Sequence, residues 1–502
     1  MFLNGLRQCA KSEKQARRIP SFYYKTILHS FIIVFFFSVL ESFAANRHWA
    51  GVHMPVKRKL RLCLLLALFL FAAGGMIVED AFAVDWYGTA GWSYRKAITV
   101  GGSAVTSGPH VNFPMLVNLS SDAQLAASAQ TDGDDILFTS SDGTTKLAHE
   151  IERYTSGTGA LVAWVQVPSI NNGTVIYMYY GNSAATNQQN VTGTWDSNYM
   201  AVWHLNSTGW SDSTSNANNL TAYGNANTTA SGQVGTGLTL DGSGDYLSTV
   251  TDKTTLNFLA TEDFTFSAWI NTPTGAAARE ILTDYNGNSA TPGYHFSVTA
   301  ANYLWQMTHE DSAHMAGITT LNTVTGSWTY VSSVRASDII SLYKNGSAQT
   351  TNPAGPYTDP TITTNTNTAT PQATAIGARN VGGTPGLYFN GMIDEVRVSR
   401  YARFAGWIQT EYDNQNSPSA FSSAGSEDST FTWTGATDTN WDTAGNWDVN
   451  AVPGAGHTVV IPDVSAGSNR YPVLGTSPTT VTNLTINANA SLNLNGKNLT
   501  VS

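Results

Sequence analysis

Short runs of β-branched and aromatic residues recur from about residue 84 to the C-terminus, and clusters of turn residues separate them. KAITV, ALVAWVQV, TVIYMYY and FTFSAWI are examples, and Gly, Asp or Asn stands near the ends of each run. Runs of this composition favour strands, and strands repeated every ten to fifteen or so residues favour two packed antiparallel sheets. At 502 residues the chain has room for about three domains of roughly 150 residues each. The sequence therefore predicts an all-β, multidomain protein.

Charge is scarce and unevenly distributed along the chain. Charged residues make up 12% of the sequence, against about 25% in a typical soluble protein. The first 83 residues hold 11 of the 25 Lys and Arg but only 4 of the 35 Asp and Glu, which leaves 14 basic and 31 acidic residues in the remainder. A body this acidic repels phosphate, so we exclude nucleic acid as a partner.

Both cysteines, Cys9 and Cys63, stand in the N-terminal region. The rest of the chain therefore has no disulfide, no cysteine metal ligand and no cysteine nucleophile. An exported chain of this size without cysteine is more typical of bacteria than of animals.

The segment 54–83 has the three parts of a Sec signal peptide. A basic start is followed by an apolar run from Leu62 to Ala73 and by the small-residue end Ala81-Phe82-Ala83. We therefore predict that this segment is cleaved and that the chain after it is exported. A retained membrane helix is the alternative, although the apolar run is short for a membrane span and Gly74-Gly75 interrupts it.

Residues 1–53 carry a second apolar segment, from Ile27 to Ala45, behind basic residues. Two signals in tandem serve no purpose in export, so we interpret residues 1–53 as an extension of the gene model, with translation starting at Met54. If the extension belongs to the protein, it predicts an uncleaved inner-membrane anchor.

Residues 84–188 form the first predicted domain, which is β-sandwich-like. Four ordered motifs in it resemble DUF2341, a domain of unknown function found in bacterial envelope and secreted proteins. The motifs are WSYRKAITV (Trp92 to Val100), DGDDILFTSSDGTTKLAHEIERY (Asp132 to Tyr154), VAWVQVPSI (Val162 to Ile170) and IYMYYGN (Ile176 to Asn182). The resemblance supplies no activity.

Two polar features of this domain invite a chemical interpretation. The DGDD run, Asp132 to Asp135, offers oxygen ligands but lacks the EF-hand spacing, so we interpret it as a solvated turn. His149 and Glu150 stand side by side, as acid/base groups can. A single histidine without a second motif is more often structural, and we adopt that interpretation.

Residues 195–424 form the second predicted domain, and eight ordered motifs in it resemble the laminin G-like, concanavalin A-like jelly roll. The motifs are VWHLN (Val202 to Asn206), DSTSNANN (Asp212 to Asn219), LDGSGDYL (Leu240 to Leu247), FTFSAWI (Phe264 to Ile270), WTYVSSV (Trp328 to Val334), LYKNG (Leu342 to Gly346), IGARN (Ile376 to Asn380) and NGMIDEVRVSRYA (Asn390 to Ala402). The resemblance implies a β-sandwich that binds carbohydrate or protein and often holds one structural calcium. Within it, Asn345-Gly346 predicts a tight hairpin turn.

The adjacent carboxylates Asp394 and Glu395 raise the question of catalysis. Neighbouring residues of a regular strand point to opposite faces, so we expect Asp394 to share a face with Met392 and Val396, and Glu395 to lie opposite, against an arginine or solvent. A glycosidase needs two carboxyl groups at one bond. Unless a bulge intervenes, this pair does not meet that need, and we find no other catalytic motif. We predict that the chain is not an enzyme.

Calcium is the ion that the sequence favours, as a structural cofactor. Asp212 and the Asn-rich loop after it would supply oxygen ligands, with Asn216 and Asn218 as candidates and Asp394 joining them if the terminal strands pair as in the family. The same DSTSNANN run is also typical of an ordinary polar turn, and the sequence leaves both interpretations open.

Glycan binding needs exposed rings with polar neighbours, because sugar C–H faces stack on aromatic side chains. The loop-rich middle of the second domain offers four candidates, each of which also suits a core position. They are Tyr285, Tyr294, Trp305 and His309.

Residues 429–502 open with three tryptophans among Gly, Asp and Asn, and they resemble the opening segment of bacterial β-solenoid adhesins. Apolar pairs then recur every seven or eight residues: Leu484/Ile486, Leu492/Leu494 and Leu499/Val501. Such spacing predicts short stacked strands, and we expect the start of a β-solenoid. A small appended β domain is the alternative.

Together these features favour a bacterial protein, secreted or held at the cell surface, whose jelly roll binds a glycan or a surface protein without catalysis. Association with the outer membrane or cell envelope is part of this expectation. One alternative is an accessory binding region of a polysaccharide-degrading enzyme whose catalytic module lies outside this sequence. Another is a structural envelope or adhesin stalk.

Overall fold

The structure is a computed structural model of the 502-residue chain, and residues 84–502 form one compact unit. It describes residues 86–87, 91–206, 210–229, 232–251, 253–258, 262–275, 277–285, 293–309, 315–324, 326–337, 339–352, 357–358, 373–381, 384–465, 470–475 and 479–502. The predicted extension 1–53 and the predicted signal 54–83 lie outside these residues. Within them, no helix is both long and apolar enough to span a membrane.

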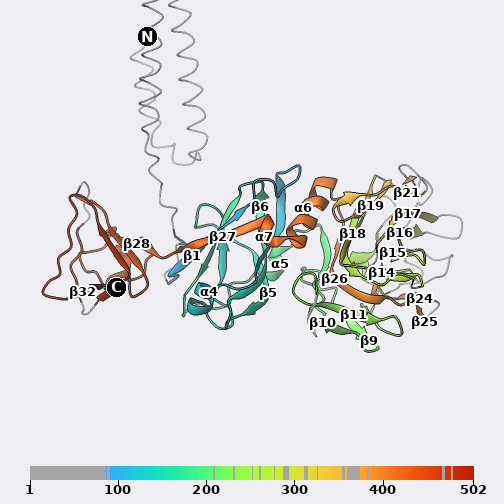
Figure 1. The fold of residues 1–502 in the computed structure, drawn as a ribbon, viewed down its shortest axis with the longest axis horizontal. Coiled ribbons are helices and arrows are strands. Elements are labelled where there is room, and N and C mark those ends of the chain that lie inside the picture. Colours follow the sequence, from blue (N-terminus) through green and yellow to red (C-terminus); the bar gives the residue numbers. More distant parts are fainter. Residues whose placement is uncertain are drawn as a thin grey trace, which may run out of the picture. The chain divides into compact units, whose positions relative to one another are not determined.

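The first domain is a sandwich of a five-stranded and a three-stranded antiparallel sheet (Figure 1). The five-stranded sheet has the order β27-β1-β7-β3-β4 and the three-stranded sheet has the order β2-β6-β5. The strands are β1 (Tyr94–Val100), β2 (His110–Leu119), β3 (Leu137–Thr139), β4 (Lys146–Leu147), β5 (His149–Thr155), β6 (Ala160–Ile170), β7 (Val175–Tyr180) and β27 (Ser422–Asp428). Alternation along β6 gives its two faces different partners: Ala163 and Val165 face the sandwich core, and Val162 and Trp164 face away from it.

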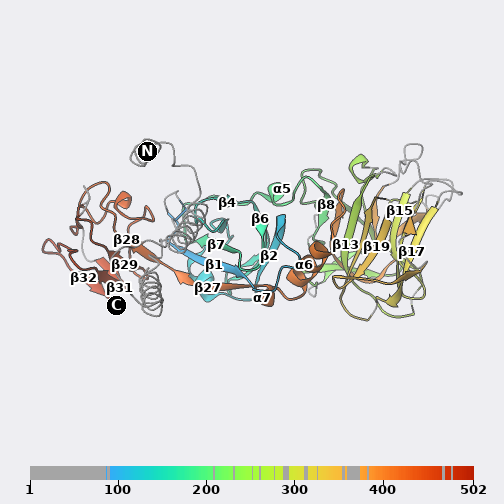
Figure 2. The same cartoon turned by 90° about the horizontal axis from the view of Figure 1, so that it is seen from above.

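The second domain has two larger antiparallel sheets, whose strands lie side by side in Figure 2. The nine-stranded sheet consists of β8 (Tyr199–Trp203), β10 (Asn227–Thr229), β11 (Gly237–Asp241), β13 (Phe264–Asn271), β18 (Thr329–Ala336), β19 (Ile339–Lys344), β20 (Ser347–Ala348), β22 (Tyr357–Thr358) and β26 (Asn390–Ser399). The eight-stranded sheet consists of β9 (Thr221–Tyr223), β12 (Tyr246–Ser248), β14 (Arg279–Thr283), β15 (Gly293–Val298), β16 (Tyr303–His309), β17 (Met315–Thr323), β21 (Thr351–Asn352) and β23 (Ala375–Ile376). The prediction of an all-β jelly roll is confirmed.

The core of this domain lies between its two sheets. Every second residue of the facing strands β13 and β15 is apolar and points into this core. Phe266 and Ile270 of β13 face Phe296 of β15 in this fully buried cluster. The predicted hairpin turn is also present. Asn345 (φ 49°) and Gly346 (φ 77°) join β19 to β20. Both residues have the positive φ that the two central positions of such a turn require.

The chain leaves the second domain by returning to the first. Helix α6 (Ala405–Asn416) packs on β2, where the amide of Asn414 exchanges two hydrogen bonds with the backbone of Leu116, at 2.7 and 3.1 Å. The short helix α7 (Pro418–Phe421) follows, and β27 then pairs with β1. The chain therefore enters the second domain from the first and packs against the first again when it leaves.

In its described residues, the C-terminal segment contains parallel strands but no solenoid. Strands β28 (Thr430–Thr432), β29 (Thr458–Ile461) and β31 (Asn483–Ile486) form one parallel sheet, and β30 (Thr479–Val481) pairs in parallel with β32 (Leu499–Val501). The expected solenoid is not supported, because one member of each apolar pair points to solvent: Ile486, Leu494 and Val501 are all exposed. The three tryptophans instead pack edge to face in a small core, with centroids 5.0 Å apart for Trp433 and Trp447 and 4.7 Å for Trp441 and Trp447.

The strand that carries Asp394 and Glu395 is interrupted by a β-bulge. The pairing of β26 with β13 shifts between Ser267 and Trp269, and Glu395 has a φ of +52°. Ile393, Val396 and Val398 consequently share the core face, and the two carboxylates both face away from the core. The expectation that they lie on opposite faces is wrong, because the extra residue resets the alternation.

Candidate functional site

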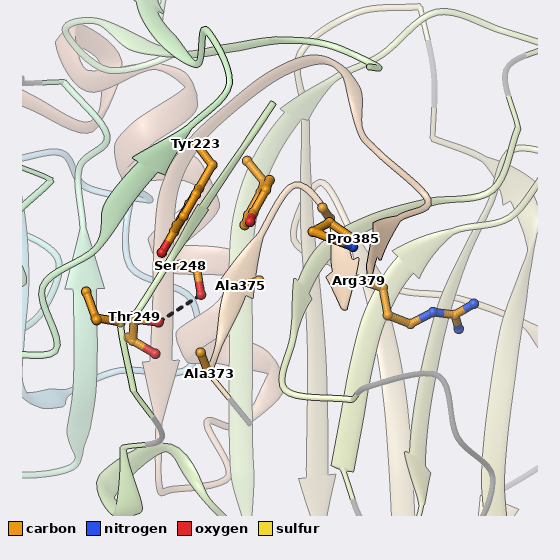
Figure 3. Close-up of a pocket in the computed structure, with 10 residues that line it drawn as sticks. Tyr223, Ser248, Thr249, Ala373, Ala375, Arg379 and Pro385 are labelled. Carbon is orange, nitrogen blue, oxygen red and sulfur yellow. Dashed lines mark hydrogen bonds between the residues drawn. The ribbon is translucent and has the colours of Figure 1, made fainter. Parts of the chain in front are cut away.

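A surface pocket of about 260 Å³ opens at the edge of the eight-stranded sheet (Figure 3). Edge strand β9 supplies Tyr223, and its neighbour β12 supplies Tyr246 and Ser248. Arg379 of β24 (Arg379–Val381) and Pro385 of β25 (Thr384–Gly386) line the opposite side. Because β9 has no strand beyond it in the sheet order, its side chains stand at the border of the sheet, within reach of solvent.

Two tyrosine rings stack face to face at this pocket. The rings of Tyr223 and Tyr246 are stacked, with centroids 4.5 Å apart and planes 3° from parallel, and Tyr223 is 37% exposed. The ring of Tyr388 lies 6.4 Å from that of Tyr246, tilted by 43°. Burial, followed by the neighbouring Tyr223 and Tyr388, raises the pKa of Tyr246, so its phenol stays protonated near neutral pH and can donate a hydrogen bond.

Polar groups stand beside these rings. Ser248 Oγ donates to the carbonyl of Thr249 at 2.9 Å, and Figure 3 shows Tyr223 directed toward Ser248. Rings flanked by hydroxyl groups suit a sugar, which presents C–H faces and hydroxyls together.

A second aromatic cluster lies on the outer face of the same sheet. Tyr294 and Phe296 of β15 face the core, so His295 between them faces outward. The ring of His295 stacks on Tyr285 at 5.4 Å and meets Trp305 edge to face at 4.5 Å. Two of the predicted glycan residues, Tyr285 and Trp305, are therefore brought together around a histidine that the sequence analysis did not single out.

Charged groups connect this cluster with the pocket. Glu280 of β14 lies 3.5 Å from His295 Nδ1 and 3.7 Å from Arg379, and Arg379 also stands over the ring of Tyr285, 5.5 Å from its centroid. Neither ring nitrogen of His295 has a hydrogen-bond partner among the residues that the structure describes. Arg379 thus belongs to both the pocket and the cluster.

The other two predicted glycan residues do not join this arrangement. Tyr294 is fully buried in the core between the two sheets, on the face opposite His295. His309 ends β16, where its backbone pairs with Gly293 and Met315, and its side chain lies outside the described part of the structure.

Residues 241–409 match the concanavalin A-like lectin/glucanases superfamily. Residues 132–213 match DUF2341, and residues 432–502 match DUF8693, which is also a domain of unknown function. The first two matches confirm the resemblances noted in the sequence. The superfamily includes both lectins and glucanases, so the name of the concanavalin A-like domain leaves binding and hydrolysis open.

Solved structures resemble parts of the chain, whereas a comparison with curated proteins found no match. The CBM40 of Ruminococcus gnavus IT-sialidase, bound to α2,3-sialyllactose, is 15% identical with a TM-score of 0.27, and the match covers 30% of this chain and 84% of that one. The binding domain of Paraclostridial Mosquitocidal Protein 1 is 15% identical with a TM-score of 0.35, covering 43% and 52%. The botulinum neurotoxin serotype G binding domain is 12% identical with a TM-score of 0.35, covering 44% and 52%.

The predicted calcium ligands of the concanavalin A-like domain fall in two separate places. Asp212 accepts four hydrogen bonds: from the backbone of Val202 at 3.0 Å, of Thr214 at 2.9 Å and of Asn218 at 2.8 Å, and from the Thr214 hydroxyl at 2.9 Å. The side-chain amides of Asn216 and Asn218 both donate to the carbonyl of Met200 in β8. These bonds fold the loop 212–218 onto β8, as a polar turn does, and calcium binding here stays a prediction.

Asp394 has a different environment. Its Oδ2 accepts a hydrogen bond from the Val234 backbone at 2.9 Å, whereas its Oδ1 has no partner, and no described contact joins it to Asp212. Burial raises the pKa of Asp394 well above its usual range, and the carboxylates of Glu395 and Glu152 raise it further. The bulge therefore places Asp394 in a group of acids that includes a residue of the first domain.

Glu395 lies between two cations. Its Oε1 is 2.6 Å from His204 Nδ1 and its Oε2 is 2.7 Å from Arg397, which confirms the expected arginine neighbour. Burial acts to raise the pKa of Glu395, but His204 and Arg397 lower it overall. Arg397 also pairs with Glu411 of α6 at 2.7 Å and stands over the ring of Trp164 at 4.4 Å. This buried network joins the two domains.

Sequence reasoning missed the pocket residues Tyr223, Tyr246 and Arg379. Tyr223 stands in an Asn-rich run that predicts a loop, whereas Tyr246 and Arg379 stand in the motifs LDGSGDYL and IGARN, which were noted only for their resemblance to the family. The one sequence feature that indicates such a site is a tyrosine next to Gly in a short strand at the edge of a sheet. No further strand or layer covers the ring of such a tyrosine.

Proposed function

We propose that the chain is an exported bacterial protein whose concanavalin A-like domain binds a carbohydrate, without catalysis, at the Tyr223 pocket. The observation that carries this proposal is the stacked, partly exposed pair Tyr223 and Tyr246 at the pocket, beside the hydroxyls of Ser248 and Thr249. Export rests on the predicted signal 54–83, which lies outside the described residues.

Binding rather than hydrolysis is supported by the side chains at the pocket. The ten residues that line it are Tyr223, Tyr246, Ser248, Thr249, Val250, Ala373, Ala375, Ala378, Arg379 and Pro385. This set holds no carboxyl or imidazole group, whereas glycoside hydrolysis uses a pair of carboxyl groups that flank the scissile bond. A sugar in this pocket would be held by stacking and hydrogen bonds.

The test is a glycan array probed with residues 84–502 as wild type and as single variants. We expect the wild type to bind a defined group of glycans. Tyr223→Ala and Tyr246→Ala should each weaken binding at least tenfold, which is about 1.4 kcal/mol, because each removes one ring of the stacked pair. Tyr401→Ala is the matched control, since Tyr401 is 49% exposed and lies outside the pocket lining.

The same array also tests the prediction of calcium binding. Repeating it with calcium and with EDTA shows whether glycan binding depends on a divalent ion, and an unchanged melting temperature in EDTA would count against calcium. Failure of the wild type to bind any glycan in either condition would overturn carbohydrate recognition and favour a surface-protein ligand.

A further inference from the structure

Three side chains with metal-binding atoms meet where the two domains join. Glu152 comes from β5 of the first domain, His204 follows β8, and Glu395 stands at the bulge of β26. One ligand-type atom from each lies within 4.8 Å of those of the other two. The two domains therefore both contribute to the group, which lies outside the carbohydrate pocket.

The group is withdrawn from water. The side chains of Glu152, His204 and Glu395 are 1%, 6% and 0% exposed. His204 Nδ1 is 2.6 Å from Glu395 Oε1 and 3.7 Å from Glu152 Oε2. One imidazole nitrogen and two carboxylate oxygens form a ligand set that suits Zn²⁺ and similar ions, whereas Ca²⁺ takes six to eight oxygens.

The partners of these ligands are arranged as they are in metal sites. His204 presents Nδ1 to the group, while its Nε2 faces the Glu150 carboxylate at 3.3 Å. Glu150 is fixed in turn by the Trp195 indole at 2.9 Å and the Ser213 hydroxyl at 2.7 Å. A carboxylate behind the distal nitrogen is the usual support of a metal-binding histidine, because it orients the ring.

The remaining ligands are held in the same manner. The indole of Trp164 donates to Glu152 Oε2 at 3.0 Å, and Arg397 holds Glu395 Oε2 at 2.7 Å. Each of the three side chains is thus oriented by a neighbour before any ion arrives, which limits the reorganisation that binding requires.

Two observations point to a missing positive charge. Among the described residues, Glu152 Oε1 is buried and has no hydrogen-bond partner, and such an atom is costly and uncommon in native proteins. In addition, within the part of the chain that the structure describes, the carboxyl groups of Glu150, Glu152, Glu395 and Glu411 share two cationic partners, His204 and Arg397. A divalent cation would offset this excess.

We propose that Glu152, His204 and Glu395 bind one divalent transition-metal ion, with Zn²⁺ as the best match, and that the ion ties the first domain to the concanavalin A-like domain. His204 Nδ1 ligates the ion and gives up the proton it shares with Glu395, and that proton leaves to solvent. The ion site shares no residue with the Tyr223 pocket.

The test measures metal content in the chain from residue 84 onward, without affinity histidines. After chelation and dialysis against ZnCl₂, we expect one Zn²⁺ per wild-type chain and a higher melting temperature than in the chelated protein. Co²⁺ should give visible absorption bands typical of four or five ligands. CaCl₂ should not displace either ion.

Variants separate this site from adventitious binding. Glu152→Gln and Glu395→Gln should lose the bound Zn²⁺ and the Co²⁺ bands. Glu280→Gln should keep both, and it is a matched control because Glu280 is also a buried carboxylate beside a histidine, His295. If a variant fails to fold, the wild-type stoichiometry and Co²⁺ spectrum decide alone. Folded wild type that holds no stoichiometric Zn²⁺, or site variants that retain it, would overturn the proposal.

Discussion

Burial decides the chemistry of individual side chains in this protein. His149 begins β5, is fully buried and meets Phe138 edge to face at 5.3 Å. Burial lowers the pKa of His149 to about 4, and the Lys146 ammonium lowers it as well. The ring therefore serves the core as a neutral aromatic group, which is the structural role expected from the sequence.

His149 predicts a loss of stability in acid. The folded pKa lies below the unfolded value of about 6.5, so the unfolded chain binds the proton first, and the free energy of unfolding falls as pH drops from about 6.5 to 4. The full effect is on the order of 3 kcal/mol. His149→Gln removes this titration and should flatten the pH dependence in urea unfolding over that range. If the variant and the wild type show the same dependence of the unfolding free energy on pH, the His149 ring is protonated in the folded protein without loss of stability.

For single residues, strand alternation predicts the sheet face of a side chain wherever the strand is regular. It fails where the backbone departs from a regular strand. Asp394 and Glu395 were assigned to opposite faces, and one inserted residue put them on the same face. Nothing in the letters MIDEV marks the bulge, because Glu395 is not a residue type that favours a φ of +52°. The interdomain network was therefore out of reach of the sequence.

At the scale of elements, strand β26 organises both faces of its sheet. Its apolar residues close the core, its bulge turns Asp394 and Glu395 toward the first domain, and Gly391 lets it approach β13 closely. A Cβ atom on Gly391 (φ +134°) would lie 2.2 Å from the carbonyl oxygen of Asn271. This glycine is required by the packing of two backbones.

Gly391→Ala should lower the free energy of unfolding by about 2 kcal/mol or more, because the new methyl group meets backbone that cannot move aside. Gly244→Ala is the control: Gly244 also has a positive φ, +87°, but a Cβ there would meet nothing within 4 Å. We expect the control to cost about 1 kcal/mol. Equal losses in thermal or urea unfolding would show that φ alone, and not the contact with Asn271, sets the effect.

Elements with strong local signals were predictable. The Asn345-Gly346 turn and the alternating runs of β6 and β13 carry their structure in their own residues. The C-terminal apolar pairs misled in a specific way. Their spacing suits stacked strands, but the burial of Ile486 and Leu494 depends on layers that the local spacing does not specify, and both are exposed.

At the scale of the whole molecule, each site is assembled from residues distant in sequence. The pocket joins Tyr223 and Tyr246 to Arg379, and the interdomain group joins Glu152 to His204 and Glu395. Family motifs predicted the fold that carries these residues, because fold depends on many weak signals that agree. The family motifs did not predict the Tyr223 pocket, because its position depends on the loops that meet at one edge of the sheet.

Carbohydrate binding at the Tyr223 pocket can be followed by NMR through the tyrosine rings themselves. Residues 84–502 with ¹³C-labelled tyrosine rings are titrated with a glycan selected on the array, and Tyr→Phe variants assign the signals. We expect the Tyr223 and Tyr246 ring signals to shift in proportion to occupancy, while Tyr330, fully buried in the fold, stays unchanged. Saturable binding that shifts other tyrosines and leaves Tyr223 and Tyr246 still would contradict binding at this pocket.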